Sequence, residues 1–127
     1  MYSITIEGRF SAAHAIKDYP GDCSRLHGHN YRISVSVESE KLDELGMAFD
    51  FHELQTITKD VAQLLDHQNL NELDFFSYQN PTAENIARFI YTRIEEQMPV
   101  YVKLKEVTIH ESEGCSVTYR EQAAEKQ

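Results

Sequence analysis

The chain has 127 residues and a formal net charge of −9, with 41% hydrophobic residues. This length suffices for one domain with its own core, and we expect it over residues 1–120, followed by a polar tail over 121–127 that frays. The acidic balance argues against a nucleic-acid partner, which needs clustered Lys and Arg, and no apolar run has membrane-spanning length. We therefore expect a cytoplasmic protein whose two cysteines, Cys23 and Cys115, stay reduced.

The first 38 residues predict two paired strands. Apolar and polar side chains alternate from Tyr2 to Phe10, and the same parity continues to His14. A second alternation begins at His27 and His29 and runs to Val37. Side chains two apart in a strand point to one face, so His27 and His29 share a face. Pairing of the two strands could bring His14 to them.

Three imidazoles without a fourth protein ligand are typical of a catalytic zinc site, where the open position takes water or substrate. His14, His27 and His29 are therefore the candidate zinc ligands. The alternative is a set of unrelated histidines, a solvated pair and one core residue. His52 and His110 are interpreted as ordinary surface or supporting residues, because their positions in the predicted helix and strand do not converge on the other three.

The two cysteines differ in their surroundings. Cys23 lies in a polar loop close to Arg25 and to the proposed metal, and such neighbours favour the thiolate, which can act as base or nucleophile. It could instead close the metal site as a fourth ligand. Cys115 has the apolar parity of the last predicted strand and is expected to be buried.

Two helices are predicted in the middle of the chain. Asp50 can cap the first, with Glu53 as its capping-box partner, and the helix is expected to run to about Leu65. Thr82 can cap the second, which Pro99 ends. Both helices have apolar stripes that predict core packing: Phe51, Leu54, Thr58, Val61 and Leu65 in the first, and Ile86, Ile90, Ile94 and Met98 in the second.

After Pro99, residues 107–111 and 115–119 alternate as two more strands around a turn at Glu113-Gly114. The order β-β-α-α-β-β predicts an α+β domain, with a four-stranded, largely antiparallel sheet and two helices on one face. Such a sheet leaves its edges open. We therefore expect strand-to-strand oligomerisation, with sites at subunit boundaries.

Two further groups could carry chemistry. Asp66-His67 follows the first helix, and a carboxylate beside an imidazole can orient it and stabilise its charged form; the alternative is a polar helix end. Glu111 shares the parity of Val107 and Ile109, which places a carboxylate on the face expected to be buried. It then needs a partner, either a ligand with adjacent N–H donors or an Arg such as Arg9 or Arg120.

These residues together resemble the 6-pyruvoyltetrahydropterin synthase superfamily, and its bacterial 6-carboxytetrahydropterin synthase branch most closely. The resemblance covers almost the whole chain. The spacing of Cys23, four residues before His27, is similar to that of the carboxy-forming enzymes. The matching segments are Phe10–His14, Cys23–Tyr31, Asp50-Phe51, Leu65–Asn71, Pro81–Asn85 and Glu111.

The resemblance implies a tunnelling fold (T-fold) and a homohexamer of two stacked trimers, with active sites between subunits. It implies one zinc per subunit on the three histidines, Cys23 as catalytic thiol, Asp66 and His67 as a proton relay, and Glu111 as anchor of the pterin ring. The substrate would be 7,8-dihydroneopterin triphosphate. The products would be 6-carboxy-5,6,7,8-tetrahydropterin, acetaldehyde and triphosphate, on the queuosine route.

Alternatives stay open within and outside this family. A pyruvoyl-forming or sepiapterin-cleaving enzyme would share the zinc, the thiol and the fold. A non-catalytic zinc-binding or pterin-binding module would need neither the thiol nor the Asp-His pair. A chain of charge −9 must also accept an anionic triphosphate, for which Lys17 and Arg25 are the nearest cations in sequence.

Overall fold

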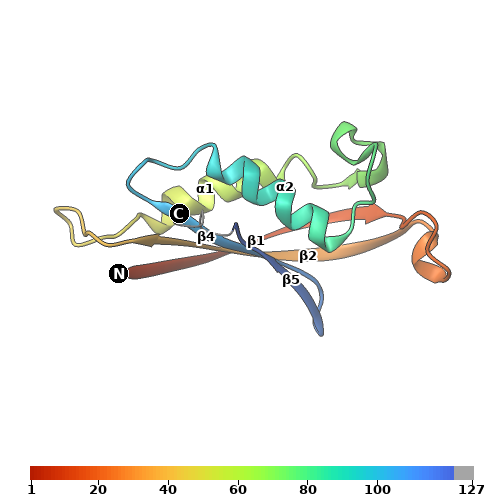
Figure 1. Cartoon of the computed structure of the whole chain (residues 1–127), viewed down its shortest axis with the longest axis horizontal. Helices are drawn as coiled ribbons and strands as arrows, with labels where there is room; N and C mark the ends of the chain where they lie inside the picture. Colours follow the sequence, from red (N-terminus) through yellow and green to blue (C-terminus); the bar gives the residue numbers. More distant parts are fainter. Residues whose placement is uncertain (122–127) are drawn as a thin grey trace, which may run out of the picture.

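The structure, a computed structural model, describes residues 1–121. Two helices lie together on one face of a single twisted sheet (Figure 1). The long elements are β1 (Tyr2–His14), β2 (His27–Ser39), α1 (Phe51–Ala62), α2 (Ala83–Glu95), β4 (Lys103–Ser112) and β5 (Cys115–Tyr119). A two-residue strand, β3 (Gln68–Asn69), and short 3-10 turns at Asp22–Ser24, Leu70–Glu72 and Asp74–Phe76 complete the fold. The predicted α+β class and the helix-covered face are confirmed.

The sheet has five strands in the order β3-β1-β2-β4-β5, which corrects the expected four. The extra strand, β3, pairs with β1 in parallel through Ala12↔Gln68 and Ala13↔Asn69, whereas all other pairs are antiparallel. Two residues are too few for alternation to reveal a strand, which is why the sequence pattern missed it.

The core lies between the sheet and the helices. Ile33, Val35, Val107 and Ile109 on the central strands β2 and β4 have 0% exposure, as do Ile86, Ile90 and Ile94 of α2. The opposite face of the sheet carries serine, threonine and charged side chains. Alternation along the strands thus assigns one face to the core and leaves the other, called here the open face, polar.

The first helix differs in detail from its prediction. Asp50 caps α1, but its side chain accepts from the N–H of His52 and not in a reciprocal pair with Glu53. Phe51, assigned to the core stripe, is 59% exposed. The helix ends at Ala62, and after it the N–H groups of Leu64 and Leu65 bond the carbonyls three residues earlier, as in turns. Leu65 lies beyond the helix but is fully buried, as expected.

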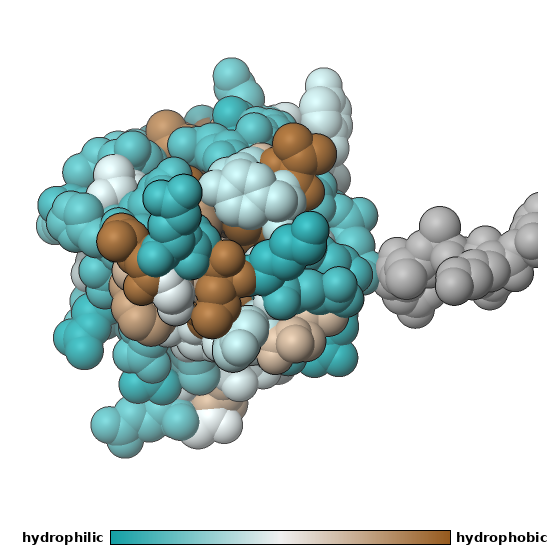
Figure 2. All heavy atoms as spheres, turned by 90° about the vertical axis from the view of Figure 1, so that its left-hand side faces the viewer, coloured by the Kyte–Doolittle hydropathy of each residue, from teal (hydrophilic) through white to brown (hydrophobic). Residues whose placement is uncertain are grey.

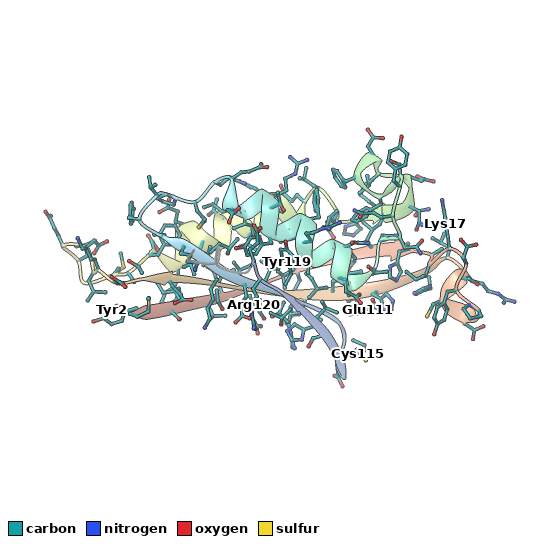
Figure 3. The ribbon with its side chains drawn as sticks, viewed as in Figure 1. Tyr2, Lys17, Glu111, Cys115, Tyr119 and Arg120 are labelled. Carbon is teal, nitrogen blue, oxygen red and sulfur yellow. The ribbon has the colours of Figure 1, made fainter. Side chains whose placement is uncertain are left out.

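The second helix follows its prediction closely, since the Thr82 side chain accepts from the N–H of Asn85. The helix ends at Glu95, and Met98 packs against the core from beyond it. Cys115 was expected to be buried and is exposed. It begins β5, the edge strand, at a point beyond the cover of the helices (Figure 3).

The end of the molecule around residues 38–50 and 100–103 carries exposed apolar side chains among charged ones (Figure 2). Among them, Leu45 is 80% and Tyr101 73% exposed. The expected tail over 121–127 falls, apart from Glu121, outside the described residues. Within residues 1–121, neither helix has the length and apolarity that a bilayer crossing requires.

Candidate metal and proton-transfer site

Three histidines meet where the β1–β2 hairpin opens into its loop. His14 ends β1 and faces His27, the first residue of β2, while His29 faces Ala12. One ring nitrogen from each histidine lies within 4.8 Å of the others, and the Nε2 atoms of His14 and His27 are 3.0 Å apart. The predicted convergence of the three histidines is therefore found.

Main-chain carbonyls orient two of the three rings. His14 Nδ1 lies 2.7 Å from the carbonyl oxygen of Pro81, and His27 Nδ1 lies 2.7 Å from that of Arg25. A carbonyl only accepts, so each Nδ1 carries the proton and each Nε2 of a neutral ring presents a lone pair. Two lone pairs at 3.0 Å repel each other unless a cation or a proton lies between them. The donor set thus fits a metal ion.

The third ring, His29, is the point where the cluster meets Glu111. His29 Nε2 is buried without a hydrogen-bond partner, although a Glu111 carboxylate oxygen is 3.5 Å away. Burial lowers the pKa of His29, and the nearby Glu111 charge opposes that shift. The neutral ring, which is the form that binds metals, is therefore favoured at pH 7.

Glu111 is half-buried, with 31% side-chain exposure. It lies where the pairing of β4 with β5 is irregular, between His110 and Ser112, and such bulges redirect side chains. The sequence interpretation offered Arg9 or Arg120 as its partner. Arg120 instead pairs with Glu106 at 3.0 Å on the other face of the sheet, and the Glu111 carboxylate lies 3.5 Å from His29 Nε2.

Tyr31 packs beneath the cluster and was not singled out by the sequence. It is 1% exposed, stacks on Phe10 with ring centroids 4.7 Å apart, and its hydroxyl lies 3.3 Å from His14 Nδ1. Burial, with a smaller contribution from Glu111, raises the pKa of the Tyr31 hydroxyl. It therefore stays neutral and serves as a rigid support for His14.

Asp66 and His67 form the predicted pair, with His67 Nδ1 3.0 Å from an Asp66 oxygen. The main chain of Ser11 holds both residues: its N–H donates to Asp66 at 2.9 Å, and its carbonyl accepts from the His67 N–H at 2.6 Å. His67 has a left-handed φ of 59°, which is uncommon for a non-glycine residue and is held here by that bond. Its side chain is 82% exposed.

The Cys23 loop is fastened by two asparagine side chains. Asn71 accepts from the N–H of Ala15 at 2.8 Å and donates to the Ala15 carbonyl at 2.9 Å. Asn80 makes the same two bonds to Lys17, at 2.9 and 3.1 Å. Between them, the Ile16 N–H donates to the Cys23 carbonyl at 2.8 Å. The two amides thus continue the β1 hydrogen-bonding pattern beyond its end and fix the backbone that supports Cys23.

A hollow of about 470 Å³ is lined by both His29 and His67, together with Ser11, Ala12, Ala13, Gly28, Asn30, Gln68 and Asn69. A larger hollow of about 860 Å³ lies at the end seen in Figure 2, and neither histidine nor cysteine lines it. The smaller hollow is therefore the candidate site, because histidines that can bind a metal or transfer protons line it. Lys17 and Glu111 lie in the half of the molecule that contains the smaller hollow, far from Tyr2 at the other end (Figure 3).

A model of one protein family, described as 6-pyruvoyl tetrahydropterin synthase, matches residues 3–122. The chain belongs to the 6-pyruvoyl tetrahydropterin synthase family. Within this family, it is 39% identical to the dihydroneopterin monophosphate aldolase of Pyrococcus furiosus, over 90% of this chain and 93% of that protein. It is 40% identical to the 6-carboxy-5,6,7,8-tetrahydropterin synthase of Synechocystis, over 76% of this chain and 77% of that protein.

The fold of this family is also found among solved structures. The 6-pyruvoyl tetrahydropterin synthase of Caenorhabditis elegans superimposes with a TM-score of 0.82 at 29% identity, covering 96% of this chain and 98% of that one. The T-fold inferred from the family resemblance is thereby confirmed.

The structure gathers some of the predicted site residues and separates others. His14, His27, His29 and Glu111 are close together, and His67 shares a hollow with His29. Cys23 is exposed and is not part of the group of possible metal ligands found in residues 1–121, which does not support a closed four-ligand site. The roles of Ser11 and the two carbonyls escaped prediction because every residue has a main chain that can form such bonds, and that of Asn71 because its partner, the main chain of Ala15, has no sequence signature.

The acid sensitivity of Asp66 is a first test of the pair. The Ser11 N–H, as the largest cause, and His67 lower the pKa of Asp66. Its stability contribution is thus present above the ordinary carboxyl pKa of about 4 and is lost as the pH falls through the lowered native value. We expect Asp66→Asn to lose less stability than the parent between pH 7 and pH 3, measured by urea unfolding. Asp60→Asn, an exposed carboxylate on α1, should behave like the parent; equal acid sensitivity of Asp66→Asn and the parent would contradict this assignment.

The asparagine clamp can be tested by an isosteric change. Asn71→Asp replaces the amide donor that bonds the Ala15 carbonyl with an acceptor, and we expect a loss of about 1–3 kcal/mol in the free energy of unfolding. Amide hydrogen exchange at residues 15–17 should accelerate. Asn30→Asp is the matched control, because the Asn30 oxygen that accepts from the Ser11 hydroxyl is retained. Unchanged exchange in Asn71→Asp would refute the clamp.

Proposed function

We propose that this protein is a zinc-dependent carbon-carbon lyase that converts 7,8-dihydroneopterin triphosphate to 6-carboxy-5,6,7,8-tetrahydropterin, acetaldehyde and triphosphate, in queuosine biosynthesis. The observation that carries the proposal is the cluster of three histidines whose ring nitrogens lie within 4.8 Å of one another. The name of the Synechocystis relative at 40% identity supports the choice of reaction.

His14, His27 and His29 would hold the zinc, one ion per subunit. The donor set fits, since two Nε2 atoms are presented by rings whose Nδ1 atoms are fixed on carbonyls, and His29 Nε2 is buried without a hydrogen bond. Three protein ligands leave a position open for substrate. Bound zinc supplies Lewis acidity to the oxygens of the substrate side chain.

The remaining residues would move protons and orient the substrate. Cys23 is the proposed catalytic thiol and lies in an exposed loop whose first part is held at Ala15 by Asn71 and at Lys17 by Asn80. Asp66 orients His67, whose ring reaches solvent and can exchange protons with a bound substrate. Glu111 is the proposed pterin anchor, because a half-buried carboxylate can accept two adjacent N–H groups of the ring.

The proposed assembly is a homohexamer, a dimer of trimers in which active sites form between subunits. Two observations support it. Most of β1 and all of β5 are free edges among the described residues, and free edges favour pairing with another copy. Cys23 and His67 are both well exposed, so each is accessible to a neighbouring chain. Lys17 and Arg25, both exposed, are the proposed cations for the substrate phosphates.

A second candidate is a dihydroneopterin phosphate aldolase activity. The specific observation in its favour is the Pyrococcus furiosus relative of that name, which is 39% identical and matches 90% of the chain. Both reactions act on a side chain of the same ring system, and residues of the site alone do not separate them. A pyruvoyl-forming synthase and a non-catalytic binding module are the remaining alternatives.

Zinc binding can be tested without activity. We expect the purified protein to hold zinc. His27→Ala should weaken the zinc affinity more than about 100-fold, because 100-fold is the upper end of the loss seen when a residue that only supports a metal ligand is removed. Binding is measured by competition with a chromogenic chelator. His52→Ala, which removes an exposed histidine of α1, should leave the affinity unchanged. Equal affinity in the parent and His27→Ala would remove the basis of the zinc assignment.

The reaction is tested by mass spectrometry of products from the zinc-loaded protein, with 7,8-dihydroneopterin triphosphate and, separately, 7,8-dihydroneopterin monophosphate. We expect 6-carboxy-5,6,7,8-tetrahydropterin and acetaldehyde from the triphosphate, and no turnover by Cys23→Ala even though it retains zinc. Cys115→Ala is the matched control and should keep full activity.

Each other product points to a different assignment. A hydroxymethyl pterin from the monophosphate alone would support the aldolase, and a pyruvoyl product the sister synthase. No turnover of either compound by a protein that holds zinc would favour a binding module.

A further inference from the structure

The open face of the sheet carries a row of two arginines and a histidine that the proposed reaction does not use. Arg9 on β1 pairs directly with Arg32 on β2, and Arg32 pairs with His110 on β4. We call these three residues the arginine row. They have the opposite parity to His14, His27 and His29, so the row and the histidine cluster occupy opposite faces of the sheet.

The two arginines of the row have no ion-pair partner among the described residues. Like charges directly opposite on antiparallel strands destabilise a sheet, yet Arg9 and Arg32 are both exposed and neither forms an ion pair within residues 1–121. Glu7 is the nearest carboxylate in sequence on this face, and it pairs across the strands with Ser34. By contrast, Arg120 on the same face is neutralised by Glu106 at 3.0 Å.

His110 positions the Arg32 guanidinium without neutralising it. Arg32 Nη2 lies 3.3 Å from His110 Nδ1, and His110 Nε2 lies 3.4 Å from the Ser34 hydroxyl. Because a guanidinium only donates, His110 Nδ1 accepts and its Nε2 carries the proton. The histidine is therefore a neutral support, and the positive charge of Arg32 remains available.

One neighbouring position on the open face offers a hydroxyl group, Ser34, which follows Arg32 on the same face of β2. The Ser11 hydroxyl on β1 already donates to Asn30 at 2.7 Å, and the Thr108 hydroxyl on β4 is bonded to Thr118 at 2.7 Å. Guanidinium groups form paired hydrogen bonds with tetrahedral oxyanions. The Ser34 hydroxyl accepts from His110 Nε2 and keeps its own proton to donate to a remaining oxygen. Two facing arginines with one hydroxyl donor beside them match an anion with several oxygens better than a single carboxylate.

We propose that the arginine row binds a phosphate-class oxyanion, either free phosphate or the phosphoryl group of an ester, between Arg9 and Arg32. The anion supplies the counter-charge that residues 1–121 do not provide at this point. This site is separate from the histidine cluster and stands independently of the proposed reaction.

The test is isothermal titration of the full-length, zinc-loaded protein with orthophosphate in a chloride buffer. Arg9→Gln and Arg32→Gln should each weaken binding at least about tenfold, because hydrogen bonds between charged groups are the strongest of their kind. Arg120→Gln is the matched control: it makes the same charge change on the same face and should alter affinity less than about twofold. A parallel titration with glycerol phosphate distinguishes the two sources, since only a site open to esters binds it.

Thermal unfolding shows whether the arginine variants lose phosphate binding because they are less stable. In phosphate-free buffer the Tm of Arg9→Gln should equal or exceed that of the parent, because a repulsive pair is removed. Phosphate should raise the Tm of the parent and not that of either row variant. The proposal is overturned if the parent does not bind phosphate, if Arg120→Gln loses as much affinity as the row variants, or if only His29→Ala abolishes binding, which would assign the anion to the histidine cluster.

Discussion

The antiparallel register of β1 against β2 is the constraint on which the rest of the structure depends. With His14 opposite His27, the apolar residues of both strands face the helices, and the three histidines fall on that same face where the helical cover ends. A slip of one residue would move every side chain of a strand to the other face. The register that builds the core therefore also assembles the metal ligands and separates them from the arginine row.

Beyond the strands, the site is held by chain segments that are distant in sequence. Ser11 binds Asp66 and His67 through its own main chain, and Asn71, which follows α1 in the sequence, binds Ala15, which precedes α1. These bonds connect the C-terminal end of β1, the Cys23 loop and the segment around β3.

Sequence reasoning succeeded where a pattern had a strict period. Alternation predicted the four long strands and the shared face of the histidines, and the Thr82 cap with its isoleucine stripe located α2. It failed where the outcome depended on local packing: Phe51 and Cys115 have apolar positions in their patterns but lie beyond the neighbours that would cover them. Strand β3 was missed because two residues have no period, and the support of His14 by Pro81 was missed because any residue has a carbonyl.

The backbone origin of these hydrogen bonds limits how such a site evolves. The groups that fix the tautomers of His14 and His27 belong to the peptide backbone at Pro81 and Arg25, not to side chains. A point substitution at either position leaves the carbonyl in the chain, so the basicity of these two rings cannot be tuned by exchanging a partner residue. Selection can reach it only by moving the loops themselves. The carbonyl at position 25 or 81 thus orients its histidine whatever side chain that position carries.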